Sequence, residues 1–209
     1  MTPMVEQPGG PSNYNIANGL TALRIVLVPV FGWLLLAENG DNWALRIWAF
    51  VVFLIAVLTD RVDGDVARRH NLVTDFGKLM DPIADKALTG MAFIGLSVID
   101  ELWWWVTIVV LGREWLITLM RLWVVRYGVL AASRGGKLKT VLQAVALSGF
   151  ILPLEEMTGR LAPVGEALWW VAVVIMVAAV VVTLVTGLEY VAAALRVRRE
   201  GQAAAGARS

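Results

Sequence analysis

The sequence predicts an all-α integral membrane protein with six transmembrane helices. Of its 209 residues, 58% are hydrophobic and 17% are charged, and the mean hydropathy is +0.70. Soluble domains are about half apolar and about a quarter charged. A soluble domain of this size buries only part of its surface, so it cannot hide such an excess. The apolar residues also form six separate runs, which predict six helices.

Each apolar run approaches the length that crosses a bilayer. About 20 helical residues cover the roughly 30 Å of hydrocarbon. The runs lack the alternation of barrel strands, which form the other fold that satisfies its backbone in lipid. The predicted helices are 20–37, 43–59, 83–99, 102–125, 138–154 and 167–190.

The placement of Lys and Arg predicts which side of the membrane each segment faces. The segments 60–80, 126–139 and 196–209 carry four of these residues each, and the opposite loops carry only Arg46 and Arg160. Basic segments stay in the cytoplasm, so both termini are expected there, in a bacterial-type plasma membrane. Tryptophans at the opposite ends of the helices predict an aromatic belt: Trp43, Trp103, Trp104, Trp105, Trp169 and Trp170.

Composition divides the chain into three regions. Residues 1–14 are polar, rich in Gly and Pro, and lack the features of a secretory signal, which predicts a disordered cytosolic N-terminus. Residues 15–195 form the helical membrane domain, and 196–209 a basic cytosolic tail. The absence of Cys excludes disulfides, and the single histidine, His70, is predicted to be solvated in a polar linker. The net charge of +1 gives no indication of a nucleic-acid partner.

The stretch 59–86 carries an unusual group of acids for a membrane protein. On a helix, Asp60 and Asp63 project together, within about 60° of Gly64 and Ala67, which leave open space beside them. A second helix is expected to start near Pro82, with Asp81 as its cap and Asp85 one turn later.

Four converging carboxylates would repel one another and are costly near a bilayer. A divalent cation removes both penalties, and all-oxygen ligands favour Mg²⁺ or Mn²⁺. The alternatives are solvated loop charges, or pairing with nearby basic residues. A small metal or proton transporter also places acids in the membrane, although such acids would be spread over its depth.

The same stretch matches a long motif, D-x2-D-G-x2-A-R-x8-G-x3-D-x3-D, at eight positions: Asp60, Asp63, Gly64, Ala67, Arg68, Gly77, Asp81 and Asp85. This pattern resembles the signature of the CDP-alcohol phosphotransferases. The resemblance implies a six-helix integral membrane enzyme, a homodimer, with a polar cavity that faces the cytosol. It implies two divalent cations, Mg²⁺ or Mn²⁺, and displacement of CMP from a CDP-linked donor by an alcohol.

Transferred position by position, the resemblance assigns the site residues. The metal ligands are Asp60, Asp63, Asp81 and Asp85. Asp85 is also the expected general base. The pocket for the cytidine diphosphate is formed by Gly64, Ala67, Arg68 and Gly77. Small side chains there let a nucleotide approach the helix, and an arginine offers forked hydrogen bonds to phosphate.

A second block of basic residues suggests an anion site for the acceptor. Arg113 and Arg121 lie about 80° apart on one helix, and Lys137 and Lys139 begin the next. Buried arginines without equal acids need an anion, and a phosphate-bearing acceptor fits. The alternative is that these side chains snorkel to lipid headgroups.

Residues 15–150 as a whole resemble the branch of the family that joins CDP-diacylglycerol to sn-glycerol 3-phosphate. The resemblance rests on the second basic block, on DFGKLMDPIADK and on an early pattern of Asn15, Asn18, Leu20, Thr21 and Arg24. Trp115 departs from the aliphatic residue expected at its position, and Arg24 is left out of the site. Inositol phosphate, or phosphatidylglycerol giving cardiolipin, are the alternative acceptors.

Overall fold

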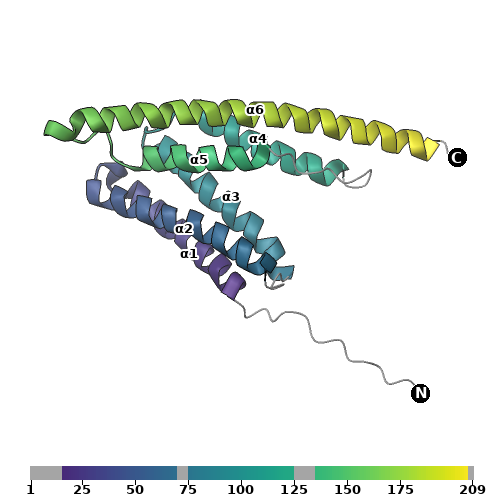
Figure 1. The fold of residues 1–209 in the computed structure, drawn as a ribbon, viewed down its shortest axis with the longest axis horizontal. Coiled ribbons are helices and arrows are strands. Elements are labelled where there is room, and N and C mark those ends of the chain that lie inside the picture. Colours follow the sequence, from purple (N-terminus) through teal and green to yellow (C-terminus); the bar gives the residue numbers. More distant parts are fainter. Residues whose placement is uncertain (1–15, 70–74, 125–134, 207–209) are drawn as a thin grey trace, which may run out of the picture. The chain divides into compact units, whose positions relative to one another are not determined.

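The structure, a computed structural model, describes residues 16–69, 75–124 and 135–206, with fewer of the side chains near the ends of these ranges. All regular structure in these ranges is helical (Figure 1). The elements are α1 (Ile16–Leu36), η1 (Ala37–Gly40), α2 (Trp43–Arg69), α3 (Asp75–Val98), α4 (Trp104–Val124), α5 (Gly135–Ile151), η2 (Gly159–Leu161) and α6 (Ala162–Gly206).

The six predicted helices are confirmed, but the third begins earlier than expected. α3 starts at Asp75, so Pro82 lies inside the helix and Asp81 is not its cap, which corrects the expected start. A proline in a helix interior removes one hydrogen bond. The apolar pattern nevertheless continues across it at helical spacing, at Phe76, Leu79, Met80, Ile83 and Ala84. The pattern therefore outweighs the proline.

The last helix continues beyond its predicted end. α6 has 45 residues and reaches Gly206, whereas the apolar run ends at residue 190. The added stretch is rich in Ala, Arg and Leu, which are strong helix formers. The basic segment that begins at residue 196 is therefore part of this helix as far as Gly206.

The described residues fall into two compact units, 1–92 and 93–209. In the first unit α1 packs against α2, with the rings of Phe31 and Phe53 5.5 Å apart. Met91 of α3 lies against Gly32 of α1, where a Cβ atom would come within 2.8 Å of its sulfur. Arg24 is fully buried in this unit.

A tight turn joins α1 to α2. Glu38, Asn39 and Gly40 have φ angles of 53°, 58° and 81°, in the left-handed region where glycine and asparagine are favoured. Asn42 then caps α2, because its side-chain oxygen accepts a hydrogen bond from the backbone N–H of Leu45 at 3.2 Å. The turn and the cap together reverse the chain direction between the two helices.

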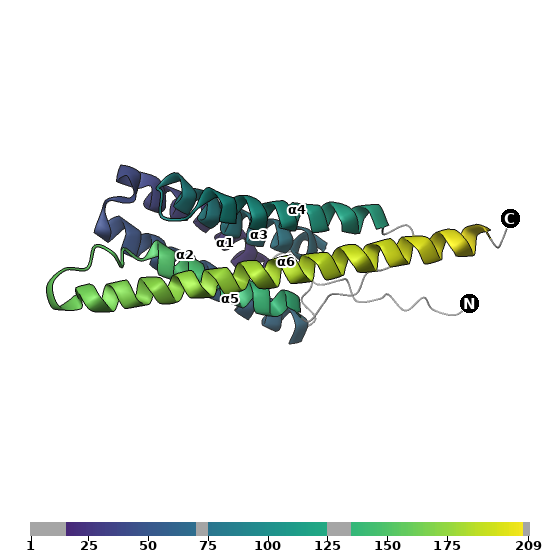
Figure 2. The same ribbon diagram turned by 90° about the horizontal axis from the view of Figure 1, so that it is seen from above.

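The second unit is built on α4, α5 and α6. α5 and α4 both pack against α6 (Figure 2). α5 runs antiparallel to α6, since its residue 149 approaches Ala172 and its residue 143 contacts Thr183. The end of α3 joins this unit through Thr107, whose hydroxyl donates to the carbonyl of Phe93 at 3.1 Å.

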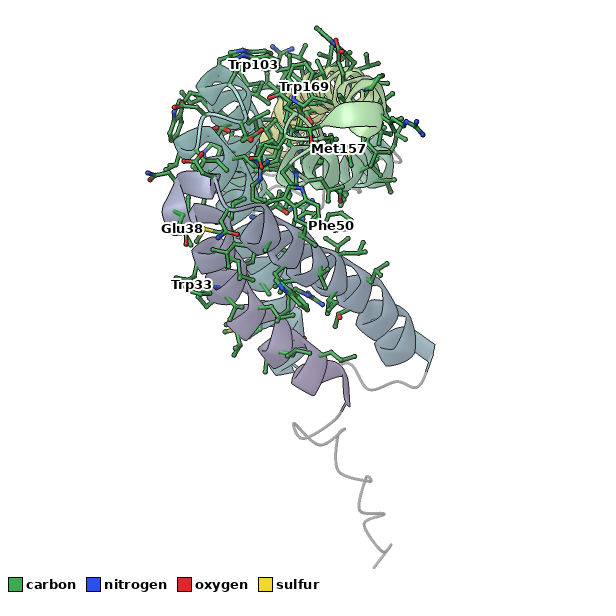
Figure 3. The ribbon with its side chains drawn as sticks, turned by 90° about the vertical axis from the view of Figure 1, so that its left-hand side faces the viewer. Trp33, Glu38, Phe50, Trp103, Met157 and Trp169 are labelled. Carbon is green, nitrogen blue, oxygen red and sulfur yellow. The ribbon has the colours of Figure 1, made fainter. Side chains whose placement is uncertain are left out.

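The surface of the helices is strongly apolar. Gly19–Gly40 and Gly159–Arg199 are the stretches in the described ranges that are long and apolar enough to cross a membrane, with mean hydropathies of 2.1 and 2.8. Trp33 points away from α1 (Figure 3) and is 66% exposed, and Leu188 of α6 is 71% exposed. Of the predicted belt, Trp43, Trp103, Trp104, Trp105 and Trp170 are exposed. Soluble monomers rarely expose so much contiguous apolar surface.

Gly165, in the first turns of α6, provides a test of packing in the second unit. A Cβ atom there would collide with the backbone oxygen of Leu154 and come within 3.0 Å of Met157. We therefore expect Gly165→Ala to lower the free energy of unfolding by about 1–3 kcal/mol, measured by thermal unfolding in detergent. Gly90→Ala is the control, because its Cβ would meet no atom of the described residues within 4 Å. Equal unfolding midpoints for the two variants would contradict this packing.

Candidate functional site

The acidic motif lies on two helices of the first unit. α2 carries Asp60, Asp63, Gly64, Ala67 and Arg68, and α3 carries Gly77, Asp81 and Asp85. The predicted i, i+3 and i, i+4 spacings on helices are therefore confirmed. Asp85 is the member of this set whose side chain is described, and it is exposed. The side chains of the others, and the whole of His70, lie outside the described residues.

The chemistry of the acidic set suits a hard divalent cation. Four carboxylates with no Cys or His among them supply oxygen ligands alone, which are the ligands of Mg²⁺ and Mn²⁺. Helical spacing places each pair on one face of its helix. The described residues contain no group of three or more metal-ligating side chains, so the convergence of the two pairs stays a prediction.

The predicted basic block of the second unit forms a cluster around one carboxylate. Glu114 accepts hydrogen bonds from Arg113, at 3.3 Å from its Nη1 atom, and from the ammonium group of Lys139. Lys139 is buried, and the Arg113 side chain is only 13% exposed. The structure thus brings Lys139 of α5 to Arg113 of α4, as predicted. Lys137 begins the same helix, but its side chain lies outside the described residues.

Arg121, two turns along α4, is held by a tyrosine of α6. Its Nε and Nη2 atoms donate to the hydroxyl oxygen of Tyr190 at 3.2 and 2.8 Å. Its guanidinium also lies 5.7 Å from the centre of that ring, where a cation is attracted by the π-electrons. Arg121 is an exposed residue, and Tyr190 fixes the direction of its guanidinium.

A stripe of hydroxyl groups on α6 contacts the polar side chains of the other two helices. Thr186 accepts a hydrogen bond from Nη2 of Arg113 at 2.9 Å, and Thr183 accepts one from Gln143 at 3.3 Å. With Tyr190 they form an i, i+3, i+7 pattern, which places all three on one face. The sequence analysis missed them, although three hydroxyls at helical spacing in the run 167–190, whose one charged residue is Glu189, were a detectable signal.

The cluster is suited to bind a further anion. Among the described contacts, Arg113 and Lys139 contribute two positive charges and Glu114 contributes one negative charge, whereas Arg121, two turns away on α4, is exposed. The Nε atom of Arg113 is buried and has no hydrogen-bond acceptor among the described residues. A buried donor without an acceptor is costly, and so is an excess of buried charge. A phosphate oxygen would reduce both costs, since arginine binds phosphate through paired N–H groups.

A comparison with protein families identifies the chain's relatives. The family described as CDP-alcohol phosphatidyltransferase matches residues 14–185. These residues include the acidic motif and Thr183 of the hydroxyl stripe, whereas Thr186 and Tyr190 lie just beyond them. The match extends from the first unit into the second.

Curated proteins resemble this chain over most of their length. A probable phosphatidylglycerophosphate synthase of Mycobacterium tuberculosis is 50% identical over 182 residues, which cover 87% of this chain and 82% of that protein. A CDP-diacylglycerol–glycerol-3-phosphate 3-phosphatidyltransferase of Bacillus subtilis is 38% identical, and the matched region covers 85% of this chain and 93% of that protein. A protein of the same name from Shigella flexneri is 34% identical, and the matched region covers 87% of this chain and 95% of that protein.

Proposed function

This chain belongs to the CDP-alcohol phosphatidyltransferase family, and from that we infer that it transfers the phosphatidyl group of CDP-diacylglycerol to sn-glycerol 3-phosphate. The products are phosphatidylglycerol phosphate and CMP. The names of its relatives support this acceptor. The structural observation that supports it is the group of Arg113, Lys139 and Glu114, which carries an excess of one positive charge and in which the buried Nε atom of Arg113 has no acceptor among the described residues.

The cluster of the second unit holds the phosphate of the acceptor. Arg113 and Arg121 donate hydrogen bonds to its oxygens, and Lys139 and Lys137 balance its charge. Fixing the phosphate orients the hydroxyl at the other end of the acceptor. Positioning of this kind lowers the barrier because it replaces an encounter in solution by an intramolecular step.

The acidic motif serves the donor. Asp60, Asp63, Asp81 and Asp85 would hold two divalent cations, Mg²⁺ or Mn²⁺, which neutralise charge on the diphosphate when bound. Gly64, Ala67 and Gly77 leave room for the nucleotide, and Arg68 donates to its phosphate or base. Asp85 accepts the proton of the acceptor's 1-hydroxyl. The freed oxygen attacks the β-phosphorus, and the bond from that phosphorus to CMP breaks.

The apolar surfaces of the helices support a location in a membrane. Six helices span it, with both termini and the polar cavity on the cytosolic side and the exposed tryptophans of the opposite side among the headgroups. The acyl chains of the donor then stay in lipid while its head reaches the cavity. We expect the enzyme to act as a homodimer in a bacterial-type plasma membrane.

A panel of acceptors tests this function. The purified protein with CDP-diacylglycerol and Mg²⁺ or Mn²⁺ should release CMP with glycerol 3-phosphate, and release should stop when a chelator removes the metal. If CMP is released only with inositol phosphate or with phosphatidylglycerol, that compound is the acceptor instead of glycerol 3-phosphate. No release with any acceptor, together with metal or proton movement across vesicles, would favour a transporter.

A further inference from the structure

We propose that Thr186 and Tyr190 of α6 are positioning residues, which fix the guanidinium groups of Arg113 and Arg121 for the phosphate of the acceptor. This inference rests on the proposed function, because it concerns how the acceptor is held. It adds α6 to the acceptor residues that the sequence analysis places on α4 and α5. The argument depends on contacts within the second unit.

The direction of the hydrogen bonds shows how Thr186 acts. Its hydroxyl is 2.7 Å from the carbonyl of Val182, one turn back on its own helix, and donates its proton there. Its lone pairs are therefore free to accept from Arg113, whose Nη2 lies 2.9 Å away. Thr186 is only 4% exposed, so water does not replace this contact easily. The hydroxyl is thus a fixed acceptor for one edge of the guanidinium.

Gly187 is the second residue of α6 that contacts Arg113. A Cβ atom at this position would lie 3.2 Å from Cγ and 3.3 Å from Nε of Arg113. The arginine therefore lies directly on the backbone of α6, at a distance that a side chain would disturb. Gly187 allows the Arg113 side chain to approach α6 closely, and Thr186 fixes the orientation of its guanidinium.

Tyr190 performs the same task for Arg121. Its hydroxyl accepts from both Nε and Nη2 of Arg121, which fixes the plane of the guanidinium. The remaining Nη1 edge then faces away from the tyrosine. Tyr190 is 7% exposed and therefore itself held by packing. A rigid partner reduces the conformational entropy that a flexible arginine loses when it binds phosphate.

The stripe also supplies a matched control in Thr183. This residue is fully buried, donates to its own helix at 2.6 Å, and accepts from Gln143 rather than from an arginine. Replacing either threonine by valine removes a buried hydroxyl that donates to its own helix and accepts from a side chain of a neighbouring helix. Only Thr186 is coupled to a residue assigned to the acceptor, so the two variants separate positioning from stability.

The test compares kinetic constants of Thr186→Val, Thr186→Ser, Tyr190→Phe and Thr183→Val in the full-length protein. Thr186→Val and Tyr190→Phe should raise the KM for glycerol 3-phosphate about 3- to 10-fold. The KM for CDP-diacylglycerol and kcat should stay near those of the unaltered protein. Thr186→Ser keeps the hydroxyl and should restore the KM, and Thr183→Val should leave it unchanged.

A double variant shows whether Thr186 acts through Arg113. In the Arg113→Ala background, Thr186→Val should have no further effect on the acceptor KM, because the contact is already lost. Additive effects, equal KM values for Thr183→Val and Thr186→Val, or failure of serine to rescue would overturn the inference. If the unaltered protein releases no CMP with glycerol 3-phosphate, the proposed function itself fails, and this assignment falls with it.

Discussion

Asp85→Asn is expected to reduce CMP release by about 10²–10⁴-fold, which is the contribution of a positioned general base. The substitution keeps the size of the side chain and removes its ability to accept a proton. Asp85 is exposed on α3, so the amide can be accommodated without a buried charge or cavity. We expect the unfolding midpoint and the amount of inserted protein to stay unchanged.

The control for Asp85→Asn is Asp41→Asn, which makes the same chemical change at an exposed position in the turn between α1 and α2. This variant should retain full CMP release. Single-turnover measurements separate chemistry from binding, since loss of the base lowers the rate of the chemical step. Near-normal release from purified Asp85→Asn would remove Asp85 from the role of base.

Arg113→Ala is expected to raise the KM for glycerol 3-phosphate about 10- to 100-fold, because charged hydrogen bonds to phosphate are lost. The KM for CDP-diacylglycerol should change far less. The KM of Arg113→Lys for glycerol 3-phosphate should lie between those of the unaltered protein and of Arg113→Ala. Lysine keeps the charge but lacks the planar guanidinium that reaches both Glu114 and Thr186. Steady-state kinetics with each substrate varied in turn measures the difference.

Arg196→Ala is the control for charge, because it removes an exposed arginine near the end of α6. It should leave both KM values within about twofold of those of the unaltered protein, as expected for a surface substitution. Equal increases of both KM values in Arg113→Ala would place Arg113 on the side of the donor. The assignment of the acceptor cluster would then have to be revised.

Local sequence patterns predicted the helices well because they depend on composition and periodicity. Six apolar runs gave six helices, and the acids at i, i+3 and i, i+4 do lie on helices. The boundaries near charged residues were less predictable. Pro82 suggested a start that the apolar pattern of α3 overrides, and the basic residues after position 195 suggested a tail where helix propensity continues α6.

The contacts between helices could not be predicted in the same way. The basic residues of α4 and α5 indicated an anion site, but the pairing of Lys139 with Glu114 depends on how the two helices pack. Thr186 and Tyr190 are 73 and 69 residues away from the arginines that they contact. Single-sequence patterns carry no information on such distances, so the third helix of the site emerged only from the structure.

The continuity of α6 has an electrostatic consequence. Arg198 lies two turns after Tyr190, about 12 Å along the helix, and its guanidinium is 4.7 Å from the ring of Trp123 on α4. That separation exceeds the Debye length of about 8 Å at physiological ionic strength, so salt screens much of the attraction that Arg198 adds there. When the ionic strength is low, the Debye length is longer, and Arg198 then adds to the attraction that an anion meets as it approaches from water. Added salt weakens this attraction and slows the capture of an anion, while the contacts of Arg113 and Arg121 with α6 stay in place.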